Sequence, residues 1–356
     1  MGVGDRVGLL SVGTANPEHV LEQARAKQFA AGFFAGQAEG LAASLASFDN
    51  AGIATRQLGR PIEWLEQPRS FPEKNAAYVE QALQISERAA LRAIEQAGIP
   101  RAEFGAIVFA TSTGIATPSL DARLVQSLGL SRAIARVPLW GLGCGGGGAG
   151  LARAATLARG LGQPVLLIAC ELCSLTFVHG DRRKANVIAV ALFGDGAAAC
   201  VVAPEPWWSV GRGPELLANY SYLIDESEHV MGWDVEDQGL RVRFSPTIPA
   251  IVEELAAEMV LDAARTARLG EGDAIEHLVV HPGGRKVLDA YESALVLEPE
   301  ALRHARAVLR DHGNMSSPTV LFVLERFLAD TPASGRAGLL LGLGPGFCAE
   351  GVVFRW

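Results

Sequence analysis

Short apolar runs rich in β-formers alternate along this chain with segments of helical periodicity. Residues 7–12, 106–110, 164–169 and 277–280 predict buried strands, because each run is mainly apolar and is flanked by turn or helix signals. The clearest helix spans about residues 249–267, where the apolar positions share one face and a glycine follows the end. This alternation predicts an α/β fold.

Chain length and composition indicate two packed halves. With 356 residues the chain exceeds the size at which a single hydrophobic core usually stops growing. Residues 203–213, APEPWWSVGRG, mix proline, glycine and two tryptophans between two long α/β stretches, which is typical of a junction. We therefore expect an N-terminal half over residues 1–205 and a C-terminal half over residues 206–356.

The net charge and the cysteines of the chain indicate what the protein binds and in which cell compartment it works. The formal net charge of -8 argues against a nucleic-acid surface, which would need clustered Lys and Arg. No run of ~20 apolar residues could span a bilayer, and the N-terminus lacks the basic and long apolar regions of a secretory signal. The 5 cysteines are too few for a disulfide framework in so long a chain. We expect a soluble, cytoplasmic protein with reduced thiols that binds neither nucleic acid nor membrane.

One cysteine stands where a nucleophile would be activated. Cys144, in GLGCGGGGAG, follows an apolar strand-like run and precedes a helical segment. A helix N-terminus stabilises a thiolate, and neighbouring glycines let backbone N–H groups approach a substrate carbonyl. A buried cysteine in a glycine-rich turn is the plainer alternative. A phosphate loop fits poorly, since both the Gly-Lys-Ser/Thr ending of a P-loop and the acidic residue of a dinucleotide site are missing.

Further polar residues stand at turns in the second half. His281 directly follows the strand-like HLVV, so its imidazole is expected at the carboxyl end of a strand, where α/β active sites lie. Asn314, in GNMSSP, precedes a helix that the serines would cap and Pro318 would begin.

Cys170 and Cys173 have the C-x-x-C spacing of a zinc or redox site, but the sequence has no second pair and the segment continues a buried strand. We expect no metal site.

Taken together, these motifs resemble the chalcone synthase superfamily of type III polyketide synthases. Cys144 in GLGCGGG, His281 in HPGG and Asn314 in GNMSS match that family's Cys-His-Asn triad in order and approximate spacing. VGTANP, LFGDGAAA and GLGPG also agree, so the resemblance covers nearly the whole chain. It implies a thiolase-type αβαβα layered sandwich made of two similar halves, assembled as a homodimer.

The resemblance also implies a reaction. Cys144, as a thiolate paired with His281, would attack an acyl-CoA starter and carry its acyl group. His281 and Asn314 would hydrogen-bond the thioester carbonyl of malonyl-CoA and stabilise the enolate left by decarboxylation. That enolate would extend the chain on Cys144 by two carbons, and repeated rounds would end in cyclisation. Coenzyme A thioesters are then the substrates, and no metal or redox cofactor is implied.

The same match implies the residues of the pocket. Phe193 in LFGDG corresponds to an aromatic gatekeeper between the CoA tunnel and the cavity, and a core phenylalanine is the alternative. Thr176 and Ser112 match positions that line the cavity. Val242 stands where the plant enzymes have a second phenylalanine, so we expect an enlarged cavity.

Coenzyme A contacts are expected at Arg56, Gly283 and Gly284. Arg56 lies in GIATRQLGRP, where family members place basic residues at the CoA phosphates, and a solvated surface arginine is the alternative. The two glycines belong to the HPGG motif. The expected partners are acyl-CoA, malonyl-CoA and a second copy of the chain.

The resemblance extends to one branch of the family. STGIATPSLDA, ELCSLTF and MGWDVEDQGLRVRFS are similar to bacterial members that prime with long fatty acyl chains and release alkylpyrones or alkylresorcinols. We therefore expect a medium- or long-chain starter. A ketoacyl synthase III, which performs one condensation with malonyl on an acyl carrier protein, is the nearest alternative, and GNMSS, HPGG and GLGPG favour the polyketide branch. A non-catalytic acyl-CoA-binding relative is a second alternative.

Overall fold

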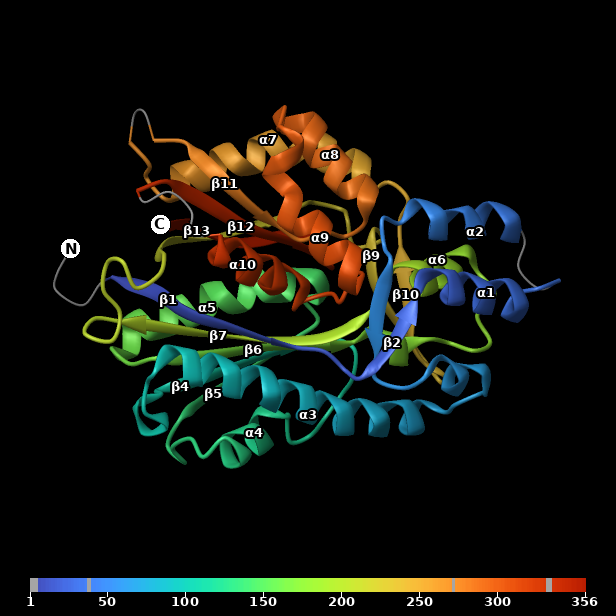
Figure 1. Ribbon diagram of the computed structural model, residues 1–356, viewed down its shortest axis with the longest axis horizontal. Coiled ribbons are helices and arrows are strands. Elements are labelled where there is room, and N and C mark those ends of the chain that lie inside the picture. The colour runs from blue at the N-terminus through green and yellow to red at the C-terminus, as the bar shows by residue number, and fades with distance from the viewer. Residues whose placement is uncertain (1–5, 37–39, 271–272, 331–334) are drawn as a thin grey trace.

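The structure is a computed structural model, and it describes residues 6–36, 40–270, 273–330 and 335–356. In this described part, a 9-stranded mixed sheet has the order β11-β12-β13-β8-β1-β7-β6-β4-β5 (Figure 1). The bounds are β1 Val7–Ala15, β4 Ala106–Thr111, β5 Ala135–Trp140, β6 Val165–Leu172, β7 Asp195–Pro204, β8 Glu215–Leu223, β11 Ile275–Val280, β12 Ala337–Gly344 and β13 Cys348–Arg355. The four strands predicted from the sequence are present within β1, β4, β6 and β11.

Helices lie in three layers around this sheet (Figure 1). Their bounds are α3 Phe71–Ala97 and α4 Asp121–Ser127 on one outer side, α5 Gly146–Leu161 and α10 Thr319–Ala329 in the middle, and α7 Ile248–Thr266, α8 Arg285–Leu295 and α9 Arg303–His312 towards the other side. α5 and α10 each contact strands from both halves of the sheet. The two halves of the sheet form separate layers, so the order across the molecule is helix, sheet, helix, sheet and helix.

The two halves of the chain fold in the same way. The first runs β1-α3-β4-α5-β6-β7 and the second β8-α7-β11-α10-β12-β13, once the elements inserted in each are set aside. β4 pairs in parallel with β6, as β11 does with β12, and β6-β7-β1 and β12-β13-β8 are antiparallel. Within the described residues the two sheets join through one residue pair, Gly8 and Glu215. The expected sandwich of two similar halves is confirmed.

Burial explains why these segments read as strands. Every residue of β6, VLLIACEL, is buried, because helices cover both faces of that part of the sheet. α3 is amphipathic and begins with a capping box, in which Ser70 accepts from the N–H of Glu73 and Glu73 accepts from that of Ser70. The chain passes from one half to the other between β7 and β8, within residues 205–214.

A smaller lobe covers one end of the sheet, at the right of Figure 1. Its elements are β2 His19–Glu22, α1 Gln23–Phe33, α2 Leu41–Asn50, β3 Thr55–Leu58, the 3-10 turn η1 Ile62–Glu66, α6 Lys184–Leu192 and the hairpin of β9 Met231–Glu236 with β10 Gly239–Phe244. A separate apolar core, built from side chains of α1, α2, α6 and η1, holds it together. None of the described helices is long and apolar enough to cross a membrane.

Candidate active site

Cys144 lies where the sequence predicts it, between a strand and a helix. β5 ends at Trp140, a 3-10 turn follows at Gly143–Gly145, and α5 begins at Gly146. The cysteine is only 5% exposed. Its thiol therefore lies at the positive end of the α5 dipole, inside the protein.

The glycines after Cys144 allow the two middle layers of the protein to touch. A Cβ atom on Gly147 would overlap the carbonyl oxygen of Ser317, just before α10, and one on Gly148 would overlap that of Glu350 in β13. The first turn of α5 thus packs backbone to backbone against the second half of the chain. This differs from the use expected from the sequence, because protein fills the space beside these two glycines and closes it to a substrate carbonyl.

Asn314 is held beside Cys144 by hydrogen bonds. The thiol of Cys144 donates to the Oδ1 atom of Asn314 over 3.8 Å, and the backbone N–H of Ser316 donates to the same oxygen at 2.8 Å. The Nδ2 atom of Asn314 donates to the carbonyl oxygen of Gly283 at 3.2 Å. These contacts fix the plane of the amide.

The helix after Asn314 starts differently from the expectation. α10 begins at Thr319, so Pro318 precedes the first helical residue, and no side chain caps the helix. The hydroxyl of Ser317 instead donates to the carboxylate of Glu171 at 3.0 Å. The serine thereby ties the start of α10 to β6.

His281 follows β11 directly, as predicted, and is buried. Its backbone N–H donates to the carbonyl oxygen of Leu341 in β12 at 2.9 Å. The next residue of β12, Gly342, lies so close to Cys144 that a Cβ atom there would come within 2.7 Å of the Cys144 carbonyl oxygen. β12 therefore brings the segments of His281 and Cys144 together. Neither ring nitrogen of His281 has a hydrogen-bond partner in the described part of the chain.

Burial makes an isolated charge costly at both residues. It raises the pKa of Cys144 to about 11 and lowers the pKa of His281 to about 3. Near neutral pH the substrate-free site therefore holds a thiol and a neutral imidazole.

A buried carboxylate near Cys144 was not anticipated from the sequence. Glu171 accepts from the N–H and the hydroxyl of Ser112 at 2.9 Å each, from the hydroxyl of Thr113 at 2.7 Å and from that of Ser317 at 3.0 Å. Burial raises the pKa of Glu171, and these donors partly offset the effect. Ser112 is therefore not the cavity-lining residue expected, because its hydroxyl is committed to Glu171 and it borders neither cavity beside Cys144.

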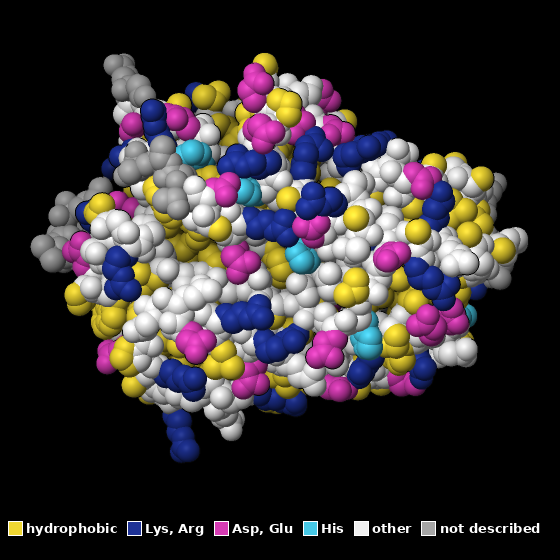
Figure 2. All heavy atoms as spheres, in the orientation of Figure 1, with side chains coloured by type: hydrophobic (Ala, Val, Ile, Leu, Met, Phe, Trp, Pro, Cys, Tyr) yellow, Lys and Arg dark blue, Asp and Glu magenta, His cyan; other side chains and the backbone are white. Residues whose placement is uncertain are grey.

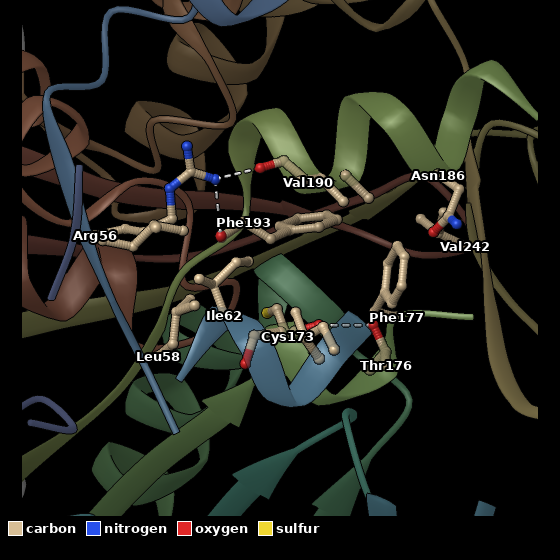
Figure 3. Close-up of a pocket in the computed structure, with 14 residues that line it drawn as sticks. Arg56, Leu58, Ile62, Cys173, Thr176, Phe177, Asn186, Val190, Phe193 and Val242 are labelled. Carbon is tan, nitrogen blue, oxygen red and sulfur yellow. Dashed lines mark hydrogen bonds between the residues drawn. The ribbon is translucent and has the colours of Figure 1, made fainter. Parts of the chain in front are cut away.

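Two small cavities share a wall, and one of them reaches Cys144. The cysteine cavity, of about 30 Å³, is lined by Cys144, Ser316, Pro345 and residues of the β9–β10 hairpin. The apolar cavity, also about 30 Å³, extends into the lobe (Figure 3) and is lined by Thr176 and by the apolar side chains Leu21, Leu58, Ile62, Leu65, Phe177, Ala189 and Val190. Cys173, Phe193 and Val242 line both cavities. Both cavities are narrow, so a bulky ligand requires these side chains to move.

A second aromatic residue at this wall comes from a position that the sequence reasoning missed. Phe244 packs edge-on against Phe193, with ring centroids 6.4 Å apart. Side chains at 242 and 244 point to the same face of β10, so Phe244 supplies a ring two residues beyond Val242. Val242 itself lines both cavities, and the enlargement relative to the plant enzymes stays a prediction. Strand alternation would have identified Phe244.

A wider groove of about 460 Å³ leads from the surface to Phe244. It lies between α2, α6 and the start of α8, and Gly283 and Gly284 line it. No Asp or Glu is among the described residues that form it, whereas three cations are: Lys184, Arg285 and Lys286. The groove can therefore hold an anionic ligand.

Arg56 does not lie at the surface, so its expected contact with CoA phosphates is wrong. The side chain is 1% exposed, and its guanidinium donates to the carbonyl oxygens of Val190 at 2.5 Å, Ala191 at 3.0 Å and Phe193 at 3.2 Å (Figure 3). A phosphate cannot reach N–H groups enclosed in this way. The solvated alternative is excluded for the same reason.

Cys170 and Cys173 do not form a shared site. The thiol of Cys170 is buried in β6 and donates to the carbonyl oxygen of Ala82, whereas Cys173 borders the two cavities. Burial raises the pKa of both thiols. Among the residues that the structure describes, no group of three or more His, Cys, Asp or Glu could hold a metal ion.

Comparisons with known sequences agree with this arrangement. Residues 63–206 match the family model of the chalcone and stilbene synthase N-terminal domain, and residues 215–356 match that of the C-terminal domain. A candidate chalcone synthase of Bacillus subtilis (strain 168) is 40% identical, with 98% of each chain covered. A 1,3,6,8-tetrahydroxynaphthalene synthase of Streptomyces peucetius subsp. caesius is 40% identical over 86% of this chain and 82% of its own.

Solved structures show the same fold over the whole chain. The crystal structure of 1,3,6,8-tetrahydroxynaphthalene synthase from Streptomyces coelicolor A3(2), a bacterial type III polyketide synthase, has a TM-score of 0.92 at 30% identity and covers 98% of this chain and 99% of its own. The C-terminal type III polyketide synthase domain of Steely1 from Dictyostelium has a TM-score of 0.90 at 26% identity, with the same coverage.

Proposed function

Because this chain belongs to the chalcone and stilbene synthase family of type III polyketide synthases, we propose that it extends an acyl-CoA starter on Cys144 by repeated decarboxylative condensation with malonyl-CoA. The enzyme class, a polyketide-forming acyltransferase, follows from the family and disfavours the two alternatives raised by the sequence. The residue roles rest on one observation: the thiol of Cys144 contacts Asn314, while the buried ring of His281 keeps both nitrogens unused in the described chain.

Starter loading uses the pair of Cys144 and His281. The neutral imidazole of His281 accepts the thiol proton, and the resulting thiolate attacks the carbonyl carbon of the starter thioester. The bond between that carbon and the CoA sulfur then breaks, and the imidazolium returns the proton to the departing CoA thiolate. The acyl group remains on Cys144.

Extension uses Asn314 and His281 as hydrogen-bond donors. Gly283 occupies one N–H of the Asn314 amide, which leaves the other N–H for the thioester oxygen of malonyl-CoA. Loss of carbon dioxide places negative charge on this oxygen, where preorganised donors stabilise it. The enolate carbon attacks the acyl group on Cys144 and releases the thiolate. These steps involve no metal or redox cofactor, because the thioesters themselves supply the activated carbonyl groups.

The groove beside α8 is the proposed coenzyme A site. Lys184, Arg285 and Lys286 replace Arg56 as candidates for the phosphates, since they line an opening free of described carboxylates. Phe244 borders both this groove and the cysteine cavity. The pantetheine arm would therefore reach Cys144 past the rings of Phe244 and Phe193.

The starter is proposed to be a medium- or long-chain fatty acyl group, and the product an alkylpyrone or alkylresorcinol. The apolar cavity supports this assignment, because aliphatic and aromatic side chains dominate its lining and it shares a wall with the cavity at Cys144. An alkyl chain entering it displaces side chains of the lobe core. 1,3,6,8-Tetrahydroxynaphthalene, for which two of the named relatives are called synthases, carries no alkyl chain, so a malonyl starter is the alternative to exclude.

The test is to incubate the purified protein with radiolabelled malonyl-CoA and starters from acetyl-CoA to stearoyl-CoA, and to identify the products by mass. Extended pyrones or resorcinols that carry the alkyl starter would support the proposal. Aromatic products from malonyl-CoA alone would replace the fatty starter with malonyl. A single β-ketoacyl product, or a requirement for carrier-bound malonate, would overturn the polyketide mechanism.

We also propose that the protein works as a cytoplasmic homodimer joined along β5. This strand lies at one edge of the sheet, and Trp140 and Ile115 beside it are 50% and 44% exposed. Exposed edge strands with apolar side chains are sites for pairing. Light scattering should give twice the mass of the chain, and Trp140→Glu should yield monomers; a monomeric wild type would contradict the proposal. The five free cysteines fit a reducing compartment.

A further inference from the structure

We propose that Arg56 is a positioning residue that sets Phe193 and Asn314 together and thereby selects the length of the starter chain. The inference rests on the proposed function, because it takes Phe193 as a wall of the starter cavity. It extends that function to a buried side chain at the edge of the apolar cavity, which acts through its neighbours.

Arg56 holds the end of α6 from inside the lobe. The last carbonyl groups of a helix lack partners within it and carry the negative end of its dipole. Arg56 donates to two of them, those of Val190 and Ala191, and to the carbonyl group of Phe193 directly after the helix. Figure 3 shows the bonds to Val190 and Phe193, and Arg56 makes no ion pair in the described chain. Burial lowers the pKa of Arg56 to about 9, and nearby Asp195 opposes this effect. The carbonyl groups therefore take the place of a paired carboxylate around a buried cation.

The same short segment carries the backbone of Asn314 on its other side. The N–H of Asn314 donates to the carbonyl oxygen of Leu192 at 2.9 Å, and the N–H of Gly194 donates to that of Asn314 at 3.0 Å. A Cβ atom on Gly194 would lie 3.2 Å from the Cβ of Arg56, so there is little slack between them. The backbone around Phe193 is thus hydrogen-bonded to Arg56 on one side and to Asn314 on the other.

These hydrogen bonds on both sides of Phe193 link the choice of starter to malonyl-CoA decarboxylation. Phe193 separates the cysteine cavity from the apolar cavity, and Arg56 itself lines the apolar cavity. If the carbonyl of Phe193 is released, the ring moves relative to both cavities and the backbone of Asn314 loses its support. Starter length and malonyl-CoA decarboxylation should therefore change together. Lysine cannot replace Arg56 in these hydrogen bonds, because its ammonium group lacks the planar guanidinium that donates to all three carbonyl oxygens.

The first test compares Arg56→Lys with Arg60→Lys. Arg60 is a matched control because it forms a surface ion pair with Glu80 at 2.5 Å, away from the cavities. Products from hexanoyl-CoA to stearoyl-CoA, and carbon dioxide release without starter, are measured for both. We expect Arg56→Lys to change the order of preferred starters and to slow decarboxylation about tenfold. Arg60→Lys should retain the wild-type order and rate.

The second test places Arg56→Lys in a Phe193→Leu background. If Arg56 acts through Phe193, the substitution should not change the starter order further once the ring is absent. An unchanged starter order in Arg56→Lys, or an equal change with and without Phe193, would overturn the inference. If Arg56→Lys does not fold, Arg56→Gln takes its place, and failure of both to fold would reduce Arg56 to a structural role. A wild type that makes no polyketide would instead refute the proposed function.

Discussion

Gly147→Ala tests whether the contact between α5 and the segment before α10 sets the geometry of the site. The new Cβ would overlap the carbonyl oxygen of Ser317 and lie 2.8 Å from the Cγ1 atom of Val320. Carbon and oxygen atoms normally approach to about 3.3 Å, so the two backbones must separate by about 1 Å. We expect a loss of about 1–3 kcal/mol in the free energy of unfolding, as overpacking costs. Turnover should fall about 100-fold, because the contact of Cys144 with Asn314 spans this joint.

Gly160→Ala is the matched control, since it adds the same methyl group to the same helix. A Cβ atom on Gly160 meets nothing within 4 Å, so alanine should leave activity intact and stabilise the protein by about 0.5–1 kcal/mol. Thermal unfolding and the rate of polyketide formation are measured for both variants. A Gly147→Ala protein as stable and active as the control would show that close packing of these backbones is not what aligns the site.

The remaining predictions concern the site and its charges. Cys144→Ala should block starter loading and keep part of the malonyl-CoA decarboxylation, whereas Asn314→Ala should do the reverse; acyl-enzyme mass and labelled carbon dioxide distinguish them, and full-length product from Cys144→Ala would remove the nucleophile assignment. Lys286→Gln should raise the KM for acyl-CoA severalfold with little change in kcat, and an unchanged KM would place the phosphates elsewhere. Burial raises the pKa of Asp195 to about 6, so its favourable contribution is present below about pH 4 and is lost as the pH rises through 6. Between pH 4 and 7 the wild type should therefore lose about 3 kcal/mol more unfolding free energy than Asp195→Asn, as measured in urea, and parallel curves would contradict this.

The sequence predicted features that local pattern determines. Apolar runs marked β1, β4, β6 and β11, and helical periodicity marked α7 to within a residue of each end. The turns that carry Cys144, His281 and Asn314 were expected at the ends of strands and starts of helices, and the structure brings the Cys144 and Asn314 side chains into contact. Each of these features depends on neighbours along the chain.

Features that depend on distant neighbours were missed or misread. Arg56 looked like a surface cation because nothing in its own segment shows that the end of α6 encloses it. Nothing in its own segment marked Glu171, because its donors come from the end of β4 with the two residues after it and from the segment before α10, about 60 and 146 positions away. Phe244 was missed, although the alternation of side chains along β10 places it on the same face as Val242. A single sequence does not encode burial locally, and burial decides the cases of Arg56 and Glu171.

The duplication of the fold has a consequence for how such a protein changes over time. His281 follows β11 at the turn where Ser112 follows β4, and α5 begins beside Cys144 as α10 begins beyond Asn314. In the proposed mechanism the two copies of one plan are specialised: one supplies the sulfur and the other the imidazole and the amide. Neither half retains a full set, so natural selection acts on the pair. If one half were exchanged between relatives, both halves would still fold. The active site would nevertheless be misaligned unless the two halves fitted together where Gly147 contacts Ser317.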